Sequence, residues 1–325
     1  MTRFTNYTYF SLTLLLHFLM SCTTPPPPPP PSVLAVSSGH VERIDSFVSM
    51  HVTARDVDIW LPDTYDGKIP HQVLYMHDGQ MLYDSTTTWN GQEWGVDEVL
   101  GQLIAEGKVP PTIVVGVYNG GPTRHPDYFP QQPFDALPDS MRQHWLTEAK
   151  KQGGISEAET SVRSDAYLRF LFEELKPVID ERYRVHTDAA QTFMAGSSMG
   201  GLISMYALGE YPKYLAGAAC LSTHWIGLMQ AGDDTIPLAF ADYVREKILP
   251  SEEHRIYFDY GTETLDAHYE PHQLRVDSIL RAKGYGADQW RSEKFPGAAH
   301  TEDAWRERLH IPLEWLLNTR LGHPK

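Results

Sequence analysis

The feature that most constrains this chain is a serine flanked by glycines, placed between an apolar strand pattern and an apolar helix pattern. Ser198 follows the strand pattern of residues 192–197 and precedes the helix pattern of residues 202–208. A serine at such a sharp turn has strained backbone angles, and a Cβ two residues before or after it would collide, which suits Gly196 and Gly200. The pattern predicts a nucleophile elbow, with the hydroxyl held out of a sheet and helical N–H groups directed at any oxyanion formed there.

Apolar strand patterns alternate with helix patterns along most of the chain, which is typical of a mostly parallel sheet flanked by helices. The first two strands alternate in polarity and are expected to be half-buried at a sheet edge, whereas residues 72–76 form a continuous apolar run of the kind buried on both faces of a parallel sheet. We expect one catalytic domain over residues 40–325. The predicted strands are 41–48, 56–61, 72–76, 112–117, 192–197, 215–221, 255–260 and 289–295, and helices are predicted over 96–104, 168–179, 202–208, 274–284 and 301–317.

The alternation of strand and helix patterns stops between residues 122 and 164, a stretch rich in proline, aromatic and charged side chains. This stretch is longer than an ordinary connection between two elements, so we expect a lid or a substrate-binding excursion. Its aromatic residues, together with Trp89 and Trp94, suit stacking on a sugar or phenolic ring, and they equally suit a core beneath long loops.

Reactive side chains gather at the carboxyl ends of parallel strands, although they lie far apart in the sequence. Ser198, an acid after the seventh strand and His300 after the eighth occur in the order that α/β-hydrolase connectivity requires. His300 would take the proton of Ser198, and the acid would fix the imidazole tautomer. Asp259 lies inside its strand, so the choice is between Asp266, which we favour for its short carboxylate, and Glu263 as the alternative.

The net charge of the chain argues against a nucleic-acid-binding protein, and the spacing of its histidines argues against a metal site. The chain has 27 Lys and Arg against 42 Asp and Glu, a net charge of −15, and no basic run, so nucleic acid would be repelled. His268 and His272 are four residues apart on an expected solvated helix face, which is not a convincing metal site. We therefore predict no metal, no cofactor and no nucleic-acid partner.

The N-terminal region has the pattern of an exported protein. Residues 1–21 combine Arg3 with a short apolar run and are predicted to be a signal peptide. Cys22 ends a tetrad similar to a bacterial lipobox, and Pro25–Pro31 would form an extended spacer within a linker over residues 22–39. We expect a lipid on Cys22 to anchor the protein outside the cytoplasm. Cys220, the only other cysteine, lies in an apolar strand and is expected to be a buried thiol.

Several of these segments together resemble the putative-esterase family of the α/β-hydrolases, which includes enterochelin esterases, feruloyl and acetylxylan esterases, S-formylglutathione hydrolase and mycolyltransferases. The resemblance covers residues 41–317 and implies an α/β-hydrolase fold, ester hydrolysis through an acyl-enzyme, and oxyanion donors at Met199 and near Gln80. The matching motifs are Tyr75–Gln80, Gly116–Asn119 with Arg124 and Tyr128, Gly196–Gly201, Gly261–Glu263 and Pro296–His300. Substrate contacts are expected from His77, Asp78, Asn119, Arg124, Tyr128, His224 and Trp225.

The leading interpretation is a lipid-anchored serine esterase that acts on an acylated sugar, a feruloyl ester or a siderophore-type ester. An acyltransferase would use the same three residues with a sugar hydroxyl in place of water. A protein of a different class would use the hydrolase scaffold only to bind a glycan or another partner. The sequence leaves the acyl group and the oligomeric state open.

Overall fold

The computed structural model describes Met1 and residues 34–230, 232–248 and 254–318. The predicted signal peptide, Cys22 and residues 25–31 of the spacer lie outside the described residues that follow Met1. Among the described residues, none of the helices combines the length and the apolar character needed to cross a bilayer.

The described residues form one sheet of eight strands in the order β1-β2-β4-β3-β5-β6-β7-β8. β1 and β2 pair antiparallel, as do β2 and β4, and every later pairing is parallel. This is the mostly parallel sheet that the sequence predicted. The strands are β1 (His40–Phe47), β2 (Arg55–Leu61), β3 (Gln72–His77), β4 (Thr112–Val117), β5 (Thr192–Ser197), β6 (Gly217–Leu221), β7 (Arg255–Gly261) and β8 (Trp290–Phe295).

The expectation that the first two strands would be half-buried at a sheet edge holds for β1 and is wrong for β2. β1 is the edge strand and is partly exposed along most of its length. β2 lies between β1 and β4 and is buried at nearly every position, with side chains in both cores. Its alternating charges are accommodated by pairing: the buried Asp58 receives two hydrogen bonds from Arg43 of β1, at 2.7 and 2.8 Å.

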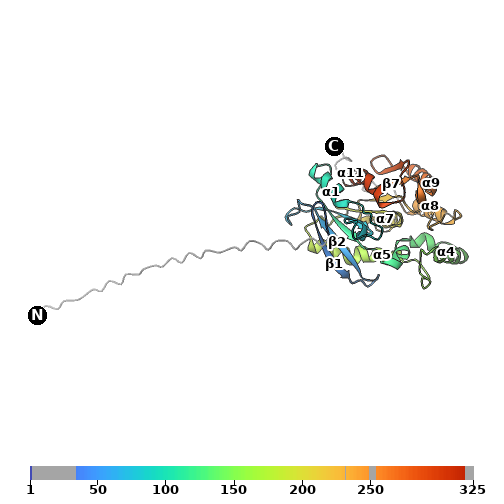
Figure 1. Ribbon diagram of the computed structural model, residues 1–325, viewed down its shortest axis with the longest axis horizontal. Coiled ribbons are helices and arrows are strands. Elements are labelled where there is room, and N and C mark those ends of the chain that lie inside the picture. Colours follow the sequence, from blue (N-terminus) through green and yellow to red (C-terminus); the bar gives the residue numbers. More distant parts are fainter. Residues whose placement is uncertain (2–33, 231, 249–253, 319–325) are drawn as a thin grey trace. The chain divides into compact units, whose positions relative to one another are not determined.

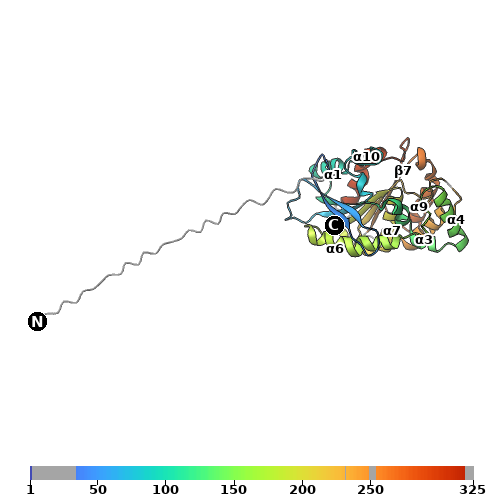
Figure 2. The same cartoon turned by 60° about the horizontal axis from the view of Figure 1, so that its bottom comes forward.

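Helices cover both faces of the sheet and enclose two apolar cores. Figure 2 shows α1 and α10 on one side of the sheet, and α6 and α7 on the other. The smaller core packs under α1 (Val96–Ala105), α10 (Glu302–Arg308) and α11 (His310–Leu317). The larger core packs under α5 (Ser164–Arg169), a π-helical segment (Phe170–Leu175), α6 (Lys176–Arg182), α7 (Met199–Glu210), α8 (Thr235–Lys247) and α9 (Glu270–Ala282).

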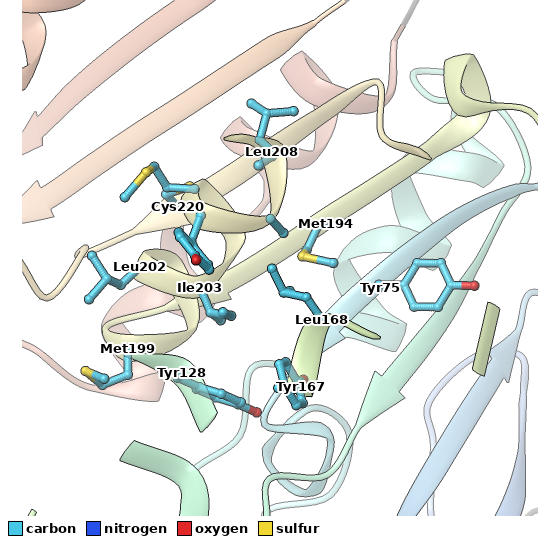
Figure 3. Packing of buried hydrophobic residues seen from close by; sticks show 14 of the residues in the cluster. Tyr75, Tyr128, Tyr167, Leu168, Met194, Met199, Leu202, Ile203, Leu208 and Cys220 are labelled. Carbon is cyan, nitrogen blue, oxygen red and sulfur yellow. The ribbon is translucent and has the colours of Figure 1, made fainter. Parts of the chain in front are cut away.

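The larger core surrounds the strand that leads to Ser198. Figure 3 shows Met194 of β5, Ile203 of α7 and Leu168 of α5 among the side chains of this core. Cys220 of β6 packs in the same core as a fully buried free thiol, as predicted, and burial raises its pKa well above the usual value. The strand before Ser198, β5, and the helix after it, α7, are therefore both held in place by packing in this core.

The excursion after β4 contains helices that the sequence analysis did not predict. They are a 3₁₀ turn (Gly121–Thr123), α2 (Arg124–Tyr128), α3 (Gln131–Asp135) and α4 (Asp139–Lys151). Phe129, Phe134 and Trp145 pack against one another in edge-on or tilted geometry, with ring centroids 4.4 to 5.7 Å apart. These aromatic rings are buried, so they hold the excursion together rather than face a substrate.

Candidate active site

Ser198 lies at a strained turn between β5 and α7. Its φ of 57° and ψ of −120° are unfavourable for a residue with a Cβ. A Cβ on Gly196 would lie 2.7 Å from the backbone of Gly200, and one on Gly200 would lie 3.3 Å from the Cβ of His77. The Ser198 amide donates to the Leu221 carbonyl of β6 at 2.9 Å, which holds the turn against the sheet. The elbow geometry predicted from the glycine spacing is therefore present.

His300 and Asp266 are brought together from the loops that follow β8 and β7. The Nδ1 of His300 lies 2.5 Å from Oδ1 of Asp266. The His300 amide donates to Oγ1 of Thr264 at 2.8 Å. Its ring lies edge-on to Tyr269 and Trp305, with centroids 5.8 and 5.0 Å away. The imidazole is thus fixed from three sides, with its Nε2 edge left for other partners.

The second oxygen of Asp266 is held by two donors. Oδ2 accepts from the Ser222 hydroxyl and from the Gly261 amide, both at 2.6 Å. Burial alone would raise the pKa of the Asp266 carboxyl, but the hydrogen bonds from His300, Ser222 and Gly261 outweigh burial and hold the pKa below its usual value. Asp266 is therefore a carboxylate with a fixed orientation.

The other two acids of this region do not meet His300. Asp259 is buried in β7 and accepts from Arg308 at 3.0 and 3.2 Å, as expected for a residue that points into a sheet face. Burial raises the pKa of the Asp259 carboxyl above its usual value, and the charge and hydrogen bonds of Arg308 offset only part of this effect. Glu263 is exposed, and its amide donates to the Ala298 carbonyl. Of the three candidates, the structure places only Asp266 against the imidazole.

Gln80 and Met199, the predicted oxyanion donors, belong to two turns close to Ser198 in the cleft. Gly79 approaches β4 so closely that a Cβ on it would lie 2.5 Å from the backbone of Gly116. This approach fixes the short 3₁₀ turn that carries Gln80. The residue before the turn, Asp78, has a left-handed conformation with φ of 58°. Met199 is the first residue of α7, so its N–H has no acceptor within the helix. Both residues line the same cleft as Ser198.

Asp78, Arg124 and Asn119 form a polar cluster beside the nucleophile. Arg124 donates to both oxygens of Asp78 at 2.7 Å, and Asn119 donates to Oδ1 at 2.7 Å. Burial raises the pKa of the Asp78 carboxyl, but the charge and hydrogen bonds of Arg124 outweigh it, and the pKa is lowered. The guanidinium of Arg124 also lies over the ring of Tyr128, 5.3 Å from the ring centroid. The charge of Arg124 is thus largely neutralised within the protein.

One cleft of about 840 Å³ contains Ser198 and His300. Of the predicted substrate contacts, Asp78, Asn119, Arg124 and His224 line it. Additional lining residues include Trp89, Asn90, Gln92, Met229, Leu265 and Glu302, together with residues 153–156 after α4. Trp89 and Met229 are 84% and 57% exposed, so the cleft offers apolar side chains to a bound molecule.

Three of the predicted substrate contacts do not line this cleft, and their side chains are buried. Trp225 is 1% exposed and donates its indole N–H to Gln273. Tyr128 is fully buried in the aromatic cluster. His77 is 3% exposed and bonds through Nδ1 to the Tyr167 hydroxyl at 2.9 Å. Burial lowers the pKa of His77 to about 3, so its imidazole is a neutral part of the core.

The sequence analysis missed two side chains that contact the predicted catalytic residues. Ser222 follows β6 and bonds Asp266, and Tyr269 precedes α9 and lies edge-on to the ring of His300, with centroids 5.8 Å apart. Neither belongs to a recognisable local motif. Their positions after neighbouring parallel strands are the one signal that could have indicated them. Within the described part of the chain, no group of three potential ligands is placed to hold a metal ion.

The profile of the family described as "Putative esterase" matches residues 50–316. The chain belongs to this family. The activity that membership indicates is hydrolysis of carboxylic esters, and the eight-stranded sheet is an α/β-hydrolase fold.

The known proteins that are similar to this chain in sequence or in structure share little sequence identity with it. An uncharacterized protein, YbbA of Bacillus subtilis (strain 168), is 22% identical over 272 residues, which are 81% of this chain and 92% of YbbA. An IroE-like serine hydrolase from Shewanella oneidensis has a TM-score of 0.61 at 16% identity, covering 86% of this chain and 80% of that one. A ferulic acid esterase from Anaeromyces mucronatus has a TM-score of 0.56 at 18% identity, covering 87% and 91%. The enterobactin esterase of Shigella flexneri has a TM-score of 0.56 at 19% identity, covering 87% and 60%.

Proposed function

We propose that this esterase uses Ser198 as nucleophile, His300 as general base and Asp266 as the acid that orients His300. The observation that carries the proposal is the contact of 2.5 Å between His300 and Asp266, beside a cleft that also holds the strained Ser198. Because Nδ1 of His300 faces the carboxylate, Nε2 is the nitrogen that can accept a proton from a hydroxyl in the cleft.

In the acylation step, Oγ of Ser198 attacks the ester carbonyl carbon while its proton moves to Nε2 of His300. The carbonyl oxygen becomes an oxyanion, and the amides of Met199 and Gln80 would donate hydrogen bonds to it. Collapse of this intermediate breaks the bond to the alcohol oxygen, which leaves with the proton from His300. The products of this step are the free alcohol and an acyl group on Ser198.

Water completes the reaction by the same steps in reverse. His300 takes a proton from water, the water oxygen attacks the acyl carbon, and the bond to Oγ breaks. The proton on His300 returns to Ser198 and the carboxylic acid is released. Asp266 keeps its charge throughout and stabilises the imidazolium that forms twice in each cycle.

For the substrate, we propose an ester with a hydroxyl-rich or phenolic portion, such as an acylated sugar, a feruloyl ester or a siderophore-type ester. The amides of Gln80, Asn90, Gln92 and Asn119 line the cleft and can bond hydroxyl groups. The exposed indole of Trp89 provides a flat apolar face for a ring. The pairing of Arg124 with Asp78 leaves little net positive charge for an anionic group.

The purified protein, assayed against short-chain nitrophenyl, feruloyl, acetyl-xylan and enterochelin esters, tests this function. Ser198→Ala should lower turnover by about 10⁴- to 10⁶-fold and abolish labelling by a fluorophosphonate, while the protein stays folded. Full esterase activity in this variant would refute the assignment of the nucleophile. Acyl transfer to an added sugar in preference to water would instead make the protein an acyltransferase, and failure of wild type to react with any ester or label would favour a binding protein.

We further propose that the esterase is exported and anchored by a lipid on Cys22. The support is in the sequence: a charged residue and a short apolar run precede the cysteine, and a spacer of seven prolines (25–31) follows it. A polyproline spacer rises about 3.1 Å per residue and would hold the catalytic domain away from a membrane surface.

A further inference from the structure

Glu302 places an acidic group in the wall of the cleft, and the mechanism above does not use it. It is the first residue of α10 and lies two positions after His300. Its Oε2 accepts from the side-chain amide of Asn90 at 2.9 Å, and both residues line the same cleft as Ser198. Among the described residues, none donates to Oε1 of Glu302, and this atom is not buried. The carboxylate therefore has an oxygen that can face a bound molecule.

The basic side chain nearest to Glu302 along the helix is already paired with other acids. Arg306 lies four residues further along α10, which is the usual spacing for an ion pair with a glutamate. It instead bonds Glu93 at 2.7 Å and Glu98 at 3.2 Å. Among the described residues, no lysine or arginine forms an ion pair with Glu302. No direct contact within this part of the chain therefore neutralises its charge.

The cleft wall has one basic side chain for two acids. Of the lysines and arginines that the structure describes, Arg124 alone lines the cleft. It gives two hydrogen bonds of 2.7 Å to Asp78, and the charge of Glu302 acts on it without a direct contact. The wall therefore has a surplus of one negative charge before its histidines are considered.

The three histidines of the cleft wall do not remove this surplus. Burial lowers the pKa of His125 to about 3 and that of His224 well below its usual value, so both imidazoles are neutral near pH 7. A proton on His300 would be balanced by the buried carboxylate of Asp266, which lies 2.5 Å away. A molecule in the cleft therefore meets a net negative charge whether or not His300 is protonated.

We propose that Glu302 makes the cleft select against anionic esters, so that the substrate is a neutral or cationic ester. The proposal rests on the proposed function, in which this cleft binds the ester. Of the substrates considered above, acylated sugars and uncharged feruloyl esters fit, and siderophore-type esters with anionic groups do not. Two unit charges about 4 Å apart in water repel by an energy that corresponds to about a fivefold change in a rate constant.

The neighbouring residue Asp303 offers a matched control. An acid in the first turn of a helix also stabilises the helix through its dipole, and both residues have that place in α10. Asp303 is exposed and does not line the cleft. Glu302→Gln and Asp303→Asn therefore each remove one charge from the helix turn, and only Glu302→Gln removes a charge from the cleft.

Three aryl acetates of different charge test the proposal: anionic 4-acetoxybenzoate, its neutral methyl ester and cationic (3-acetoxyphenyl)trimethylammonium. At low ionic strength, Glu302→Gln should raise kcat/KM for the anion relative to the neutral ester by about fivefold, and lower that for the cation by a similar factor. Comparison of each variant with wild type cancels the different intrinsic reactivities of the esters. Asp303→Asn should keep the wild-type ratios, and wild-type ratios in Glu302→Gln would overturn the proposal.

Fluorescence quenching of Trp89 is a second measurement that does not require activity. Trp89 is 84% exposed and precedes Asn90, which bonds Glu302. Its signal is obtained in each background as the difference from Trp89→Phe. Glu302→Gln should increase quenching by iodide relative to neutral acrylamide, and Asp303→Asn should not; an unchanged ratio in Glu302→Gln overturns the proposal. Failure of wild type to hydrolyse any of the three esters would count against the proposed function instead, and quenching would still decide the inference.

Discussion

The hydroxyl of Ser222 donates to Oδ2 of Asp266 at 2.6 Å, and the surrounding groups leave it no other direction. Its oxygen accepts from Nε1 of Trp305 at 2.9 Å and from Arg308 at 3.0 Å. With both acceptor sites filled by buried donors, the hydroxyl proton points to the carboxylate. The oxygen of Asp266 that faces away from His300 is therefore held by Ser222, which two side chains of α10 hold in turn.

Replacement of Ser222 by Ala should loosen Asp266 without removing any predicted catalytic group. We expect kcat to fall by about tenfold with little change in KM, because His300 is oriented less well. We also expect a loss of about 1–3 kcal/mol in the free energy of unfolding, since the buried donors of Trp305 and Arg308 lose their acceptor. Steady-state kinetics and urea unfolding check the two effects.

Ser164→Ala is the matched control for this prediction. Ser164 is also fully buried, and its hydroxyl accepts from the Gln131 amide at 2.8 Å in the excursion. This variant should lose stability and keep the wild-type kcat. A kcat of Ser222→Ala equal to that of Ser164→Ala would show that Ser222 does not position the acid.

The choice of acid can be tested with two conservative amides. Asp266→Asn should lower turnover by about 10⁴-fold, because an amide favours the wrong tautomer of His300. Glu263→Gln should remain close to wild type, since Glu263 is exposed and its amide, not its side chain, bonds Ala298. The reverse ranking in an esterase assay would assign the role to Glu263.

His77 should make the stability of the protein depend on pH. Burial lowers its pKa to about 3 in the folded state, so between that pH and the usual histidine pKa the unfolded chain binds a proton that the folded chain does not. Stability is therefore lost as the pH falls from about 6.5 to about 3, by up to about 1.4 kcal/mol per pH unit.

His77→Phe should remove this contribution and flatten the curve of unfolding free energy against pH. Urea unfolding at about pH 5 and about pH 7.5 measures the difference. His144→Gln, which changes an exposed imidazole on α4, is the control and should follow the wild-type curve. Equal pH dependence for His77→Phe and wild type would contradict the prediction.

The lipid anchor can be tested with the two cysteines of the chain. Cys22→Ser should move the protein from the membrane fraction to the soluble fraction, because buried acyl chains contribute about 0.8 kcal/mol per CH₂. Cys220→Ala alters a buried thiol and should leave the protein in the membrane fraction. An unchanged membrane fraction for Cys22→Ser would argue against a lipoprotein.

Local patterns in the sequence determined the elbow and the sheet. The strand before Ser198, the helix after it and the need for Gly196 follow from residues 192–208 alone, so no long-range contact is required to predict them. The continuous apolar runs of β3 to β7 similarly indicate strands covered on both faces. Less local features were predicted poorly: the predicted helix over 301–317 is divided into α10 and α11, and α8 was missed.

Tertiary structure alone decided which side chains meet at the end of the sheet. Asp266 rather than Glu263 reaches His300 because the loop after β7 turns through a short 3₁₀ helix, which buries Asp266 and exposes Glu263. Tyr269 and Ser222 reach the site for the same reason: they follow different parallel strands, and the packing of those strands sets their separation. The spacing of residues along the sequence does not depend on that packing. For this reason it also could not show that His77 and Trp225 lie beneath the cleft and not in it.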